Sequence, residues 1–289
     1  MKKKNIVLTG GAGYIGSHIL LDLLRNNYDV VVLDNFSNSS PNVLENIRKN
    51  TNVNFNIVKG DVCEKDLEQC FKGQSESIVI HCAGLKSPFE SQIYPVKYYS
   101  ENVGGALNLL KVMEEYGCEN ILFSSSASVY GDTNQVPIDE SCHPKPVSVY
   151  ANTKLIVEQI LNDWAKASIR RSCISLRYFN PVGADYSGLV GEVPGQKPSN
   201  LIPQIINVAS GILKRIKIYG NDYDTRDGTG ERDYVHVSDL SKAHLNALEY
   251  VMRNNGFQSV NIGTGKGITV LELIKKFEEI NSVSVPYSF

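Results

Sequence analysis

Residues 7 to 16 read Val7-Leu8-Thr9-Gly10-Gly11-Ala12-Gly13-Tyr14-Ile15-Gly16. The apolar start of this segment predicts a buried strand, and the amphipathic stretch Ile15–Asn26 that follows predicts a helix. Glycines at such a junction let the main chain turn tightly and approach a pyrophosphate, while the start of the helix offers free N–H groups. The segment therefore predicts a dinucleotide site around Gly10, Gly13 and Gly16. The alternative is that the glycines only cap a strand.

An acidic residue, Asp34, ends the second predicted strand. A carboxylate at this position can accept hydrogen bonds from both ribose hydroxyls of NAD and would repel the 2′-phosphate of NADP. No Arg or Lys occurs between Asn35 and Ser40 to bind that phosphate. The sequence therefore favours NAD as the cofactor.

Strand and helix patterns alternate through the first two-thirds of the chain, which indicates crossover connections and a parallel sheet. We predict an α/β fold: a Rossmann-like doubly wound parallel sheet over residues 1–180, and a smaller, loop-rich substrate-binding region over residues 181–289. In the first region we expect strands at Ile6–Thr9, Val30–Asp34, Phe55–Val58, Ile78–His81, Ile121–Ser124 and Cys173–Tyr178, and helices at Ile15–Asn26, Lys65–Phe71, Pro95–Tyr116 and Val149–Ala167. In the second region we expect helices at Leu201–Gly211, Ser238–Arg253 and Thr269–Ile280, a strand at Ser259–Ile262, and loops at Pro181-Val182-Gly183, at Pro194-Gly195 and from Gly220 to Gly230.

The bulk composition excludes several classes of protein. A net charge of −2 gives no indication of general affinity for nucleic acid. The uncharged stretch Asn5 to Leu21 divides into strand and helix patterns, so we expect no membrane segment and no signal peptide. Six cysteines are scattered without a Cys-x-x-Cys motif or a paired His. We therefore expect no metal site and no dense disulfide framework, and we predict a cytoplasmic protein.

Tyr150 and Lys154 stand four residues apart in a predicted helix, which places the phenol and the ammonium on one face, with Cβ atoms about 5–6 Å apart. A phenol titrates near pH 10 in solution, and a close ammonium lowers that pKa. We therefore predict Tyr150 as a general base toward an alcohol, with Lys154 lowering its pKa and Ser126 hydrogen-bonding the same oxygen. The alternative is an ordinary amphipathic pair, which the glycine turn makes less favourable.

Two further strand ends carry candidate residues. Asp61 follows the third predicted strand and could contact the adenine amine of a cofactor. The segment Cys82-Ala83-Gly84 follows the fourth and is small enough for main-chain contact with a ligand. Open α/β sheets bind ligands at the carboxyl ends of their strands. Simple packing at a strand end is the alternative for each.

A more specific signal is carried by five segments, Thr9–Gly16, Ser124–Gly131, Tyr150–Lys154, Leu176–Pro181 and Asp227–Val237. Together they resemble the UDP-glucose 4-epimerases of the extended short-chain dehydrogenase/reductase group, and the resemblance spans the whole chain. It implies that NAD stays bound while Tyr150 takes the proton of the sugar 4-hydroxyl and C4 gives a hydride to NAD. The 4-keto sugar then turns over, and the hydride returns to its other face. The net reaction interconverts UDP-glucose and UDP-galactose.

The resemblance also assigns site residues, position by position. The implied catalytic residues are Tyr150, Lys154 and Ser126. The implied cofactor contacts are Gly10, Gly13, Tyr14, Ile15, Gly16, Asp34, Asn35, Phe36, Ser37, Asn38, Ser39, Asp61, Val62, Cys82, Ala83, Gly84, Leu85, Lys86, Asn102, Tyr150, Lys154 and Phe179. The implied contacts with a UDP-sugar substrate are Ser126, Tyr150, Asn180, Asn200, Leu201, Lys217, Ile218, Tyr219 and Arg232. A guanidinium such as that of Arg232 suits the diphosphate, because it binds phosphate oxygens bidentately. The resemblance implies a homodimer through the helices Pro95–Tyr116 and Val149–Ala167.

Single residues distinguish this chain from families that catalyse related reactions. The similar 4,6-dehydratases carry an Asp-Glu pair where this chain has Ser126-Ala127, and elimination of water needs an acid and a base that these residues do not supply. Two alternatives stay open: a 4-epimerase of N-acetylated or uronic UDP-sugars, and a non-catalytic NAD-binding scaffold or sensor. Val149 and Ala151 replace the usual Pro and Gly of the family. The chain ends at Phe289, before a segment that contacts the diphosphate in the family, so we expect weaker sugar binding.

Overall fold

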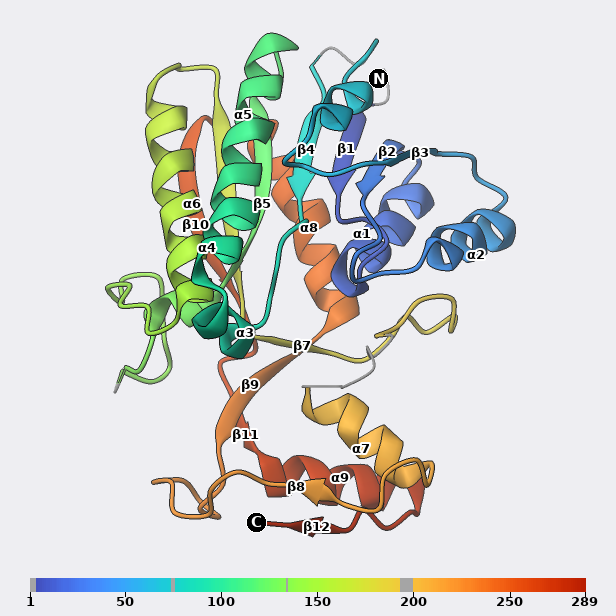
Figure 1. Cartoon of the computed structure of the whole chain (residues 1–289), viewed down its shortest axis with the longest axis vertical. Coiled ribbons are helices and arrows are strands. Elements are labelled where there is room, and N and C mark those ends of the chain that lie inside the picture. Colours follow the sequence, from blue (N-terminus) through green and yellow to red (C-terminus); the bar gives the residue numbers. More distant parts are fainter. Residues whose placement is uncertain (1–3, 74–75, 134, 193–199) are drawn as a thin grey trace.

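The computed structural model describes residues 4–73, 76–133, 135–192 and 200–289. Its dominant element within these ranges is a seven-stranded sheet whose neighbouring strands all run parallel, in the order β10-β6-β5-β4-β1-β2-β3 (Figure 1). The strand order reverses between β1 and β4, as in a doubly wound Rossmann-like sheet. The predicted fold class is therefore confirmed. The strands are β1 (Asn5–Thr9), β2 (Asp29–Asp34), β3 (Asn56–Lys59), β4 (Ile78–His81), β5 (Asn120–Ser126), β6 (Ser172–Tyr178) and β10 (Gly256–Ile262).

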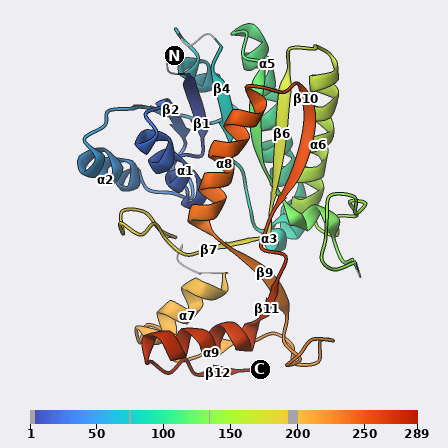
Figure 2. The same ribbon diagram turned by 180° about the vertical axis from the view of Figure 1, so that it is seen from behind.

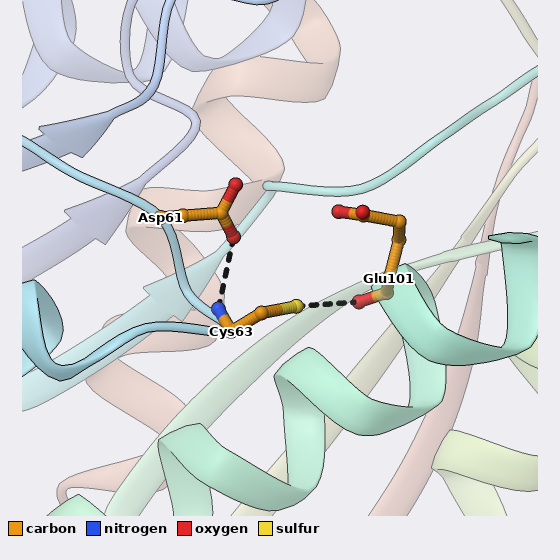
Figure 3. A group of neighbouring side chains, drawn as sticks. All are labelled: Asp61, Cys63 and Glu101. Carbon is orange, nitrogen blue, oxygen red and sulfur yellow. Dashed lines mark hydrogen bonds between the residues drawn. The ribbon is translucent and has the colours of Figure 1, made fainter.

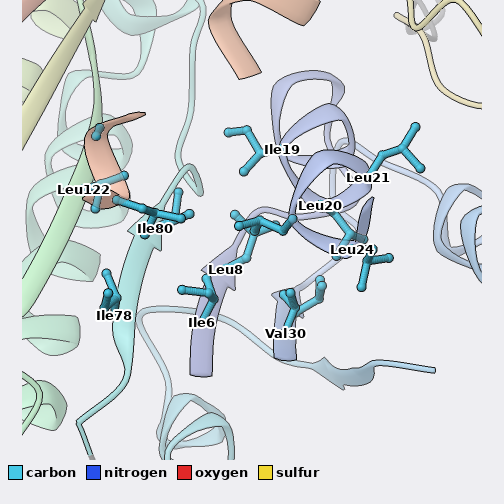
Figure 4. Packing of buried hydrophobic residues seen from close by; sticks show 14 of the residues in the cluster. Ile6, Leu8, Ile19, Leu20, Leu21, Leu24, Val30, Ile78, Ile80 and Leu122 are labelled. Atoms are coloured by element: carbon cyan, nitrogen blue, oxygen red, sulfur yellow. The ribbon is translucent and has the colours of Figure 1, made fainter. Parts of the chain in front are cut away.

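Helices cover both faces of this sheet, and α8 lies on the face opposite to α5 and α6 (Figure 2). Side chains alternate between the faces of a strand, so Ile6 and Leu8 of β1 enter one apolar core while Val7 enters the other. The first face carries α1 (Tyr14–Arg25), α2 (Pro41–Thr51) and α8 (Val237–Val251), and the second carries η1 (Lys65–Cys70), α5 (Gly105–Glu115) and α6 (Val149–Lys166). Figure 4 shows the first core, in which α1 contributes Ile19, Leu20, Leu21 and Leu24.

The helix α2 was not among the predicted elements. Ser40 caps it by accepting a hydrogen bond from the main chain of Asn42, and Pro41 occupies its first turn. Its buried positions are Leu44 and Ile47, three residues apart, on an otherwise polar helix. This helix has too few apolar residues to stand out by periodicity, although the Ser-Pro start is a recognised helix signal.

The predicted helix Pro95–Tyr116 is helical over nearly all of its extent but is not uniform. It consists of α4 (Pro95–Tyr98), a π-helical turn η2 (Tyr99–Gly104) and α5. A short helix α3 (Pro88–Ile93), capped by Ser87, precedes it. π-Helical turns occur frequently at functional sites, and η2 contains the predicted cofactor residue Asn102.

The second region contains short strands that the sequence did not reveal. The predicted loop at Pro181-Val182-Gly183 is wrong in part, because β7 (Asn180–Val182) pairs with β9 (Glu231–His236), which pairs with β11 (Gly267–Thr269). The predicted loop at Pro194-Gly195 lies outside the described residues. These strands are three to six residues long and only partly buried, so they lack the apolar alternation of a core strand. The remaining elements are α7 (Leu201–Ala209), β8 (Ile216–Lys217), α9 (Val270–Asn281) and β12 (Tyr287–Ser288).

Two elements that follow the first region in sequence pack back onto the large sheet. Both α8 and β10 follow residue 180, yet α8 packs on α1 and β10 extends the sheet beside β6. The predicted strand Ser259–Ile262 is thus the end of β10. The division at residue 180 stays a prediction, since the two regions interleave along the sequence. Among the described residues, no helix combines the length and the apolar character needed to cross a membrane.

Candidate active site

A cleft of about 2050 Å³ runs along the carboxyl ends of the parallel strands and reaches the second region. Most of the predicted cofactor residues line it; the exceptions are Phe36 and Asn102. Of the predicted substrate residues, five line the cleft, namely Ser126, Tyr150, Asn180, Asn200 and Arg232. The other four do not, namely Leu201, Lys217, Ile218 and Tyr219. They belong to α7, to β8 and to the residues after β8, where Ile218 is buried in a separate small core.

The glycine turn forms one end of the cleft, and its backbone leaves no room for side chains. Gly10 has a φ of +72°, and a Cβ there would lie 2.7 Å from the main-chain nitrogen of Ala83. A Cβ on Gly16 would collide with the main-chain oxygen of Gly10. Gly13 precedes α1 and supplies no capping side chain, so the first N–H groups of α1 are available to an anion.

Asp34 is held beside this turn by the main chain. One carboxylate oxygen accepts a hydrogen bond from the Ala12 nitrogen at 2.9 Å. The other accepts from the Phe36 nitrogen at 2.9 Å and from the Ser39 hydroxyl at 2.8 Å. A carboxylate has about four acceptor sites, so it retains capacity for a ribose hydroxyl. Phe36 thus contributes its main chain to the orientation of Asp34 rather than its ring to the cleft.

Asn102 lies under the cleft and joins two of its walls. Its side-chain oxygen accepts from the Leu85 nitrogen at 2.8 Å, and its amide donates to the Leu85 oxygen at 3.1 Å. The same amide donates to the Thr153 hydroxyl of α6 at 3.0 Å. All of these bonds are made within the protein, so Asn102 positions the segment after β4 against α6. Its predicted direct contact with the cofactor stays a prediction.

Tyr150, Ser126 and Lys154 meet where β5 ends against the start of α6. Ser148 caps α6 by accepting from the Ala151 nitrogen. The phenol of Tyr150 shares a hydrogen bond with Ser126, the last residue of β5. The Lys154 ammonium donates to the main-chain oxygen of Ser124 at 2.7 Å and lies 5.9 Å from the centroid of the Tyr150 ring. The three predicted catalytic residues are therefore brought together, although β5 and α6 are distant in sequence.

Burial shifts the pKa values of both Tyr150 and Lys154. Burial raises the pKa of Tyr150, and the hydrogen bond with Ser126 lowers it only in part. Burial also lowers the pKa of Lys154 to about 8, against the opposing influence of Cys82 and Glu158. In the protein chain alone the influence of burial on the pKa of Tyr150 is the larger one, and the lowering of that pKa by Lys154 together with an oxidised nicotinamide stays a prediction. Desolvation disfavours both charged forms, and the ammonium is directed at Ser124.

The substrate end of the cleft is built from β7 and β9. Asn180 donates its side-chain amide to the main-chain oxygen of Asp233 at 3.0 Å. Arg232 is exposed and donates to the main-chain oxygen of its neighbour Glu231, which leaves further guanidinium donors for a ligand. Asn200 donates to Glu192 at 2.6 Å. This end therefore offers a cation and amides, the groups that bind a diphosphate.

Several residues of the site were not predicted. Glu158 and Arg177 form a buried ion pair next to the catalytic residues. A signal existed for both: Glu158 follows Lys154 by one helical turn, and Arg177 interrupts an apolar strand, where a lone charge is rare unless it is paired. Asp233 accepts hydrogen bonds from the main chain of Thr264 and Gly265 at the cleft wall.

Comparisons with known proteins agree with this geometry. The sequence model of the NAD dependent epimerase/dehydratase family matches residues 6–263. The UDP-glucose 4-epimerase of Pasteurella multocida is 48% identical over 98% of this chain and 84% of its own length, and that of Bacillus subtilis is 45% identical over the same shares. This chain belongs to the UDP-glucose 4-epimerase family.

Solved structures of UDP-glucose 4-epimerases share its fold. The enzyme of Stenotrophomonas maltophila, with bound NAD and formylated UDP-arabinopyranose, has a TM-score of 0.95 and 41% identity. The enzyme of Bifidobacterium longum, in complex with NAD+ and UDP, has a TM-score of 0.94 and 43% identity. In both cases the match covers 99% of this chain and 85% of the other.

One group of side chains at the wall of the cleft, beside the residues after β3, resembles a metal site. Ligand atoms of Asp61, Cys63 and Glu101 all lie within 4.8 Å of one another (Figure 3). A thiol binds metal as the thiolate, but burial, with a smaller influence from Asp61, raises the pKa of Cys63 to about 12. Asp61 is already bonded to the Asn35 amide at 2.6 Å and to the Cys63 nitrogen. The chemistry of this group suits an adenosine contact better than a metal ion.

Proposed function

We propose that this protein interconverts UDP-glucose and UDP-galactose by inverting C4 of the sugar, with NAD bound throughout the reaction. The observation that carries the proposal is the convergence of Tyr150, Ser126 and Lys154 in the cleft that begins at the glycine turn and Asp34. The residues present suit NAD, because the turn has no side chain to block a pyrophosphate and Asp34 is held beside that turn with capacity to accept from a ribose hydroxyl. When bound, NAD supplies the hydride acceptor and a positive charge beside the phenol.

Each of the three residues has a distinct role in this proposal. Tyr150 takes the proton of the 4-hydroxyl and returns it to the keto oxygen. Ser126 orients the phenol, since it shares a hydrogen bond with that group and is itself held by the Ser128 nitrogen. Lys154 is 7% exposed and acts as a shielded positive charge that favours the phenolate. Because burial raises the pKa of Tyr150 in the chain alone, the positive charge of bound NAD would favour the phenolate as well.

The proposed substrate contacts divide the cleft into two ends. Arg232 and Asn180 bind the diphosphate, and Asn200 contacts the nucleotide side. This places the sugar between Arg232 and Tyr150. Leu201, Lys217, Ile218 and Tyr219, which do not line the cleft, remain proposed contacts for the uridine.

A homodimer is the proposed assembly. Several apolar side chains along α3, α4 and α5 are exposed to solvent: Phe89 (78%), Ile93 (53%), Val96 (76%) and Leu107 (47%). The elements that carry them lie next to α6 (Figure 1). Exposed apolar side chains on neighbouring helices favour association with a second copy. The six cysteines are free thiols, which suits the proposed cytoplasmic location.

The test is direct. Purified protein is examined for co-purifying NAD by absorbance and mass spectrometry, and is then incubated with UDP-galactose. We expect UDP-glucose to accumulate until both sugars reach equilibrium. Bound NAD without conversion would contradict the epimerase assignment but leave the cofactor site intact. The same assay with UDP-N-acetylgalactosamine defines the range of sugars.

A further inference from the structure

A buried ion pair lies behind the catalytic residues. Arg177 of β6 and Glu158 of α6 are 5% and 3% exposed, respectively. The Arg177 guanidinium donates to both carboxylate oxygens of Glu158, at 3.0 Å from Nε and 2.6 Å from Nη2. This two-point geometry fixes the angle between the side chains as well as their distance.

The pair is connected to every element that supplies a catalytic group. Ser125, the neighbour of Ser126 in β5, donates its hydroxyl to Glu158 at 2.5 Å. Arg177 donates from Nη1 to the hydroxyl of Tyr130 at 2.8 Å, and Tyr130 closes the helical turn η3 (Ala127–Tyr130) that Ser126 caps. Tyr130 in turn donates to Asn261 of β10.

The register of the sheet places these partners in one row. Ser125 of β5 and Asn261 of β10 are the paired neighbours of Arg177 on its two sides. Tyr150, Lys154 and Glu158 follow one another at four-residue intervals along α6, so they share one face of that helix. The row formed by β5, β6 and β10 therefore contacts α6 at Glu158, on the helix face that carries Tyr150 and Lys154. This contact lies one helical turn beyond Lys154.

Isolating two charges from water is costly, and a buried pair adds little to stability compared with apolar residues of the same size. A network of this size therefore calls for a role beyond stability. We propose that Arg177 and Glu158 are positioning residues, which hold α6 on β5 and β6 so that Tyr150 reaches Ser126 and Lys154 reaches the Ser124 oxygen. This inference rests on the proposed epimerase function.

The pair also acts on Lys154 through its charge. Glu158 helps to keep Lys154 protonated against burial. Loss of the Glu158 charge would lower the pKa of Lys154, and an unpaired Arg177 would lower it further. Other titratable groups face this region from the neighbouring elements: His81 and Cys82 at the end of β4, Tyr130 of η3, Tyr150 of α6 and Tyr178 of β6.

Two variants separate positioning from stability. Glu158→Gln keeps the shape and removes the charge, and Glu158→Leu combined with Arg177→Met removes both charges without leaving one unpaired. We expect both to retain NAD and to change KM for UDP-galactose by less than about twofold, while kcat falls about tenfold or more, equivalent to about 1.4 kcal/mol in the barrier. In Glu158→Gln the alkaline limb of the kcat profile should move to lower pH, because deprotonation of Lys154 then begins earlier.

The matched control is Glu114→Gln. Glu114 pairs with Arg171 at 2.7 Å between α5 and the start of β6, at the opposite end of the sheet from Ser126. This variant should change neither kcat nor the pH profile. If the double variant folds and keeps wild-type kcat, the pair has no positioning role and the inference is overturned. If neither Glu158 variant folds, the pair serves stability, and the inference is overturned as well.

A measurement that does not depend on turnover keeps this inference separate from the proposed function. The titration of Lys154 is followed by lysine-selective NMR, with its resonance assigned by the variant Lys154→Arg. We expect a lower pKa of Lys154 in Glu158→Gln than in the parent protein. An unchanged pKa would contradict the inference. A parent protein that converts no UDP-galactose would contradict the proposed function alone.

Discussion

The ammonium of Lys154 donates a hydrogen bond to the main-chain oxygen of Ser124 at 2.7 Å. This bond joins the second turn of α6 to the end of β5, two residues before Ser126. The same ammonium lies 5.9 Å from the centroid of the Tyr150 ring. Lys154 therefore has two functions in one position: it anchors the helix that carries Tyr150 and places a positive charge next to the phenol.

Replacement of Tyr150 by Phe should remove turnover without removing the cofactor. Only the phenolic oxygen is lost, and the ring that lines the cleft remains. We expect kcat to fall by about 10²-fold or more, the usual contribution of a general base, while NAD still co-purifies. The conversion of UDP-galactose and the NAD content per chain are the measurements. Near-normal turnover would rule out Tyr150 as the base.

The stability of the protein should depend on pH through Lys154. Burial lowers its pKa from the ordinary value of 10.5 to about 8, so between these values the unfolded chain binds more protons than the folded one. Stability from this group therefore rises with pH from about 8 to about 10.5 and is lowest below pH 8. Relative to Lys154→Met, the parent protein should gain at most roughly 3 kcal/mol across this range.

The measurement is chemical denaturation of both cofactor-free proteins at several pH values. The difference between them isolates Lys154, because all other groups titrate in both. Lys276, which is exposed and pairs with Glu279 on α9, provides the control variant Lys276→Met. A parent-minus-variant difference that stays constant from pH 7 to pH 10 would show that Lys154 is not desolvated as described.

Asp34→Ala should weaken the binding of NAD and its preference over NADP. The substitution removes an acceptor for the ribose and leaves three donors, the nitrogens of Ala12 and Phe36 and the hydroxyl of Ser39, without their partner. Dissociation constants for NAD and NADP are the measurements. Asp29→Ala removes an exposed carboxylate at the other end of β2 and should alter neither. An unchanged ratio of the two constants in Asp34→Ala would place the ribose elsewhere.

Asn102→Ala should destabilise the segment after β4 that lines the cofactor site. It would leave the nitrogen and oxygen of Leu85 without their side-chain partner, at a cost of about 1–3 kcal/mol for buried polar groups. We expect a lower melting temperature and a faster loss of NAD. Asn50→Ala removes an exposed amide that bonds within α2, and it should leave both quantities as in the parent. Equal NAD retention in the two variants would contradict a supporting role for Asn102.

Val96→Asp combined with Leu107→Asp should convert the proposed dimer into a monomer. Both side chains are exposed on α4 and α5, and a charge at the centre of an apolar interface has no compensating partner. Light scattering after gel filtration measures the mass. Ile280→Asp, at a position 70% exposed on α9 in the second region, serves as the control. A parent protein that is monomeric at high concentration would rule out the proposed assembly.

Local sequence was sufficient for the features that depend on neighbours along the chain. The glycine turn, the Asp34 at the end of β2, and the four-residue spacing of Tyr150 and Lys154 each follow from backbone geometry within one strand, turn or helix. The order of strands and helices followed from short apolar runs, which are continuous in β1 and β4 because both faces of the sheet are covered, and from the longer amphipathic patterns between them. The resemblance of whole segments added the identity of residues such as Arg232, which no periodicity could single out.

Tertiary structure alone decided the relations between distant segments. Four features depend on packing between parts of the chain that local propensity does not relate. They are the contact of Tyr150 with Ser126, the direction of the Lys154 ammonium, the π-helical turn that contains Asn102, and the return of β10 to the sheet. The protonation states of Tyr150 and Lys154 also depend on tertiary packing. Desolvation is a property of the surrounding volume rather than of the sequence interval, so the pKa values were set by burial and could not be inferred from the spacing of a phenol and an amine.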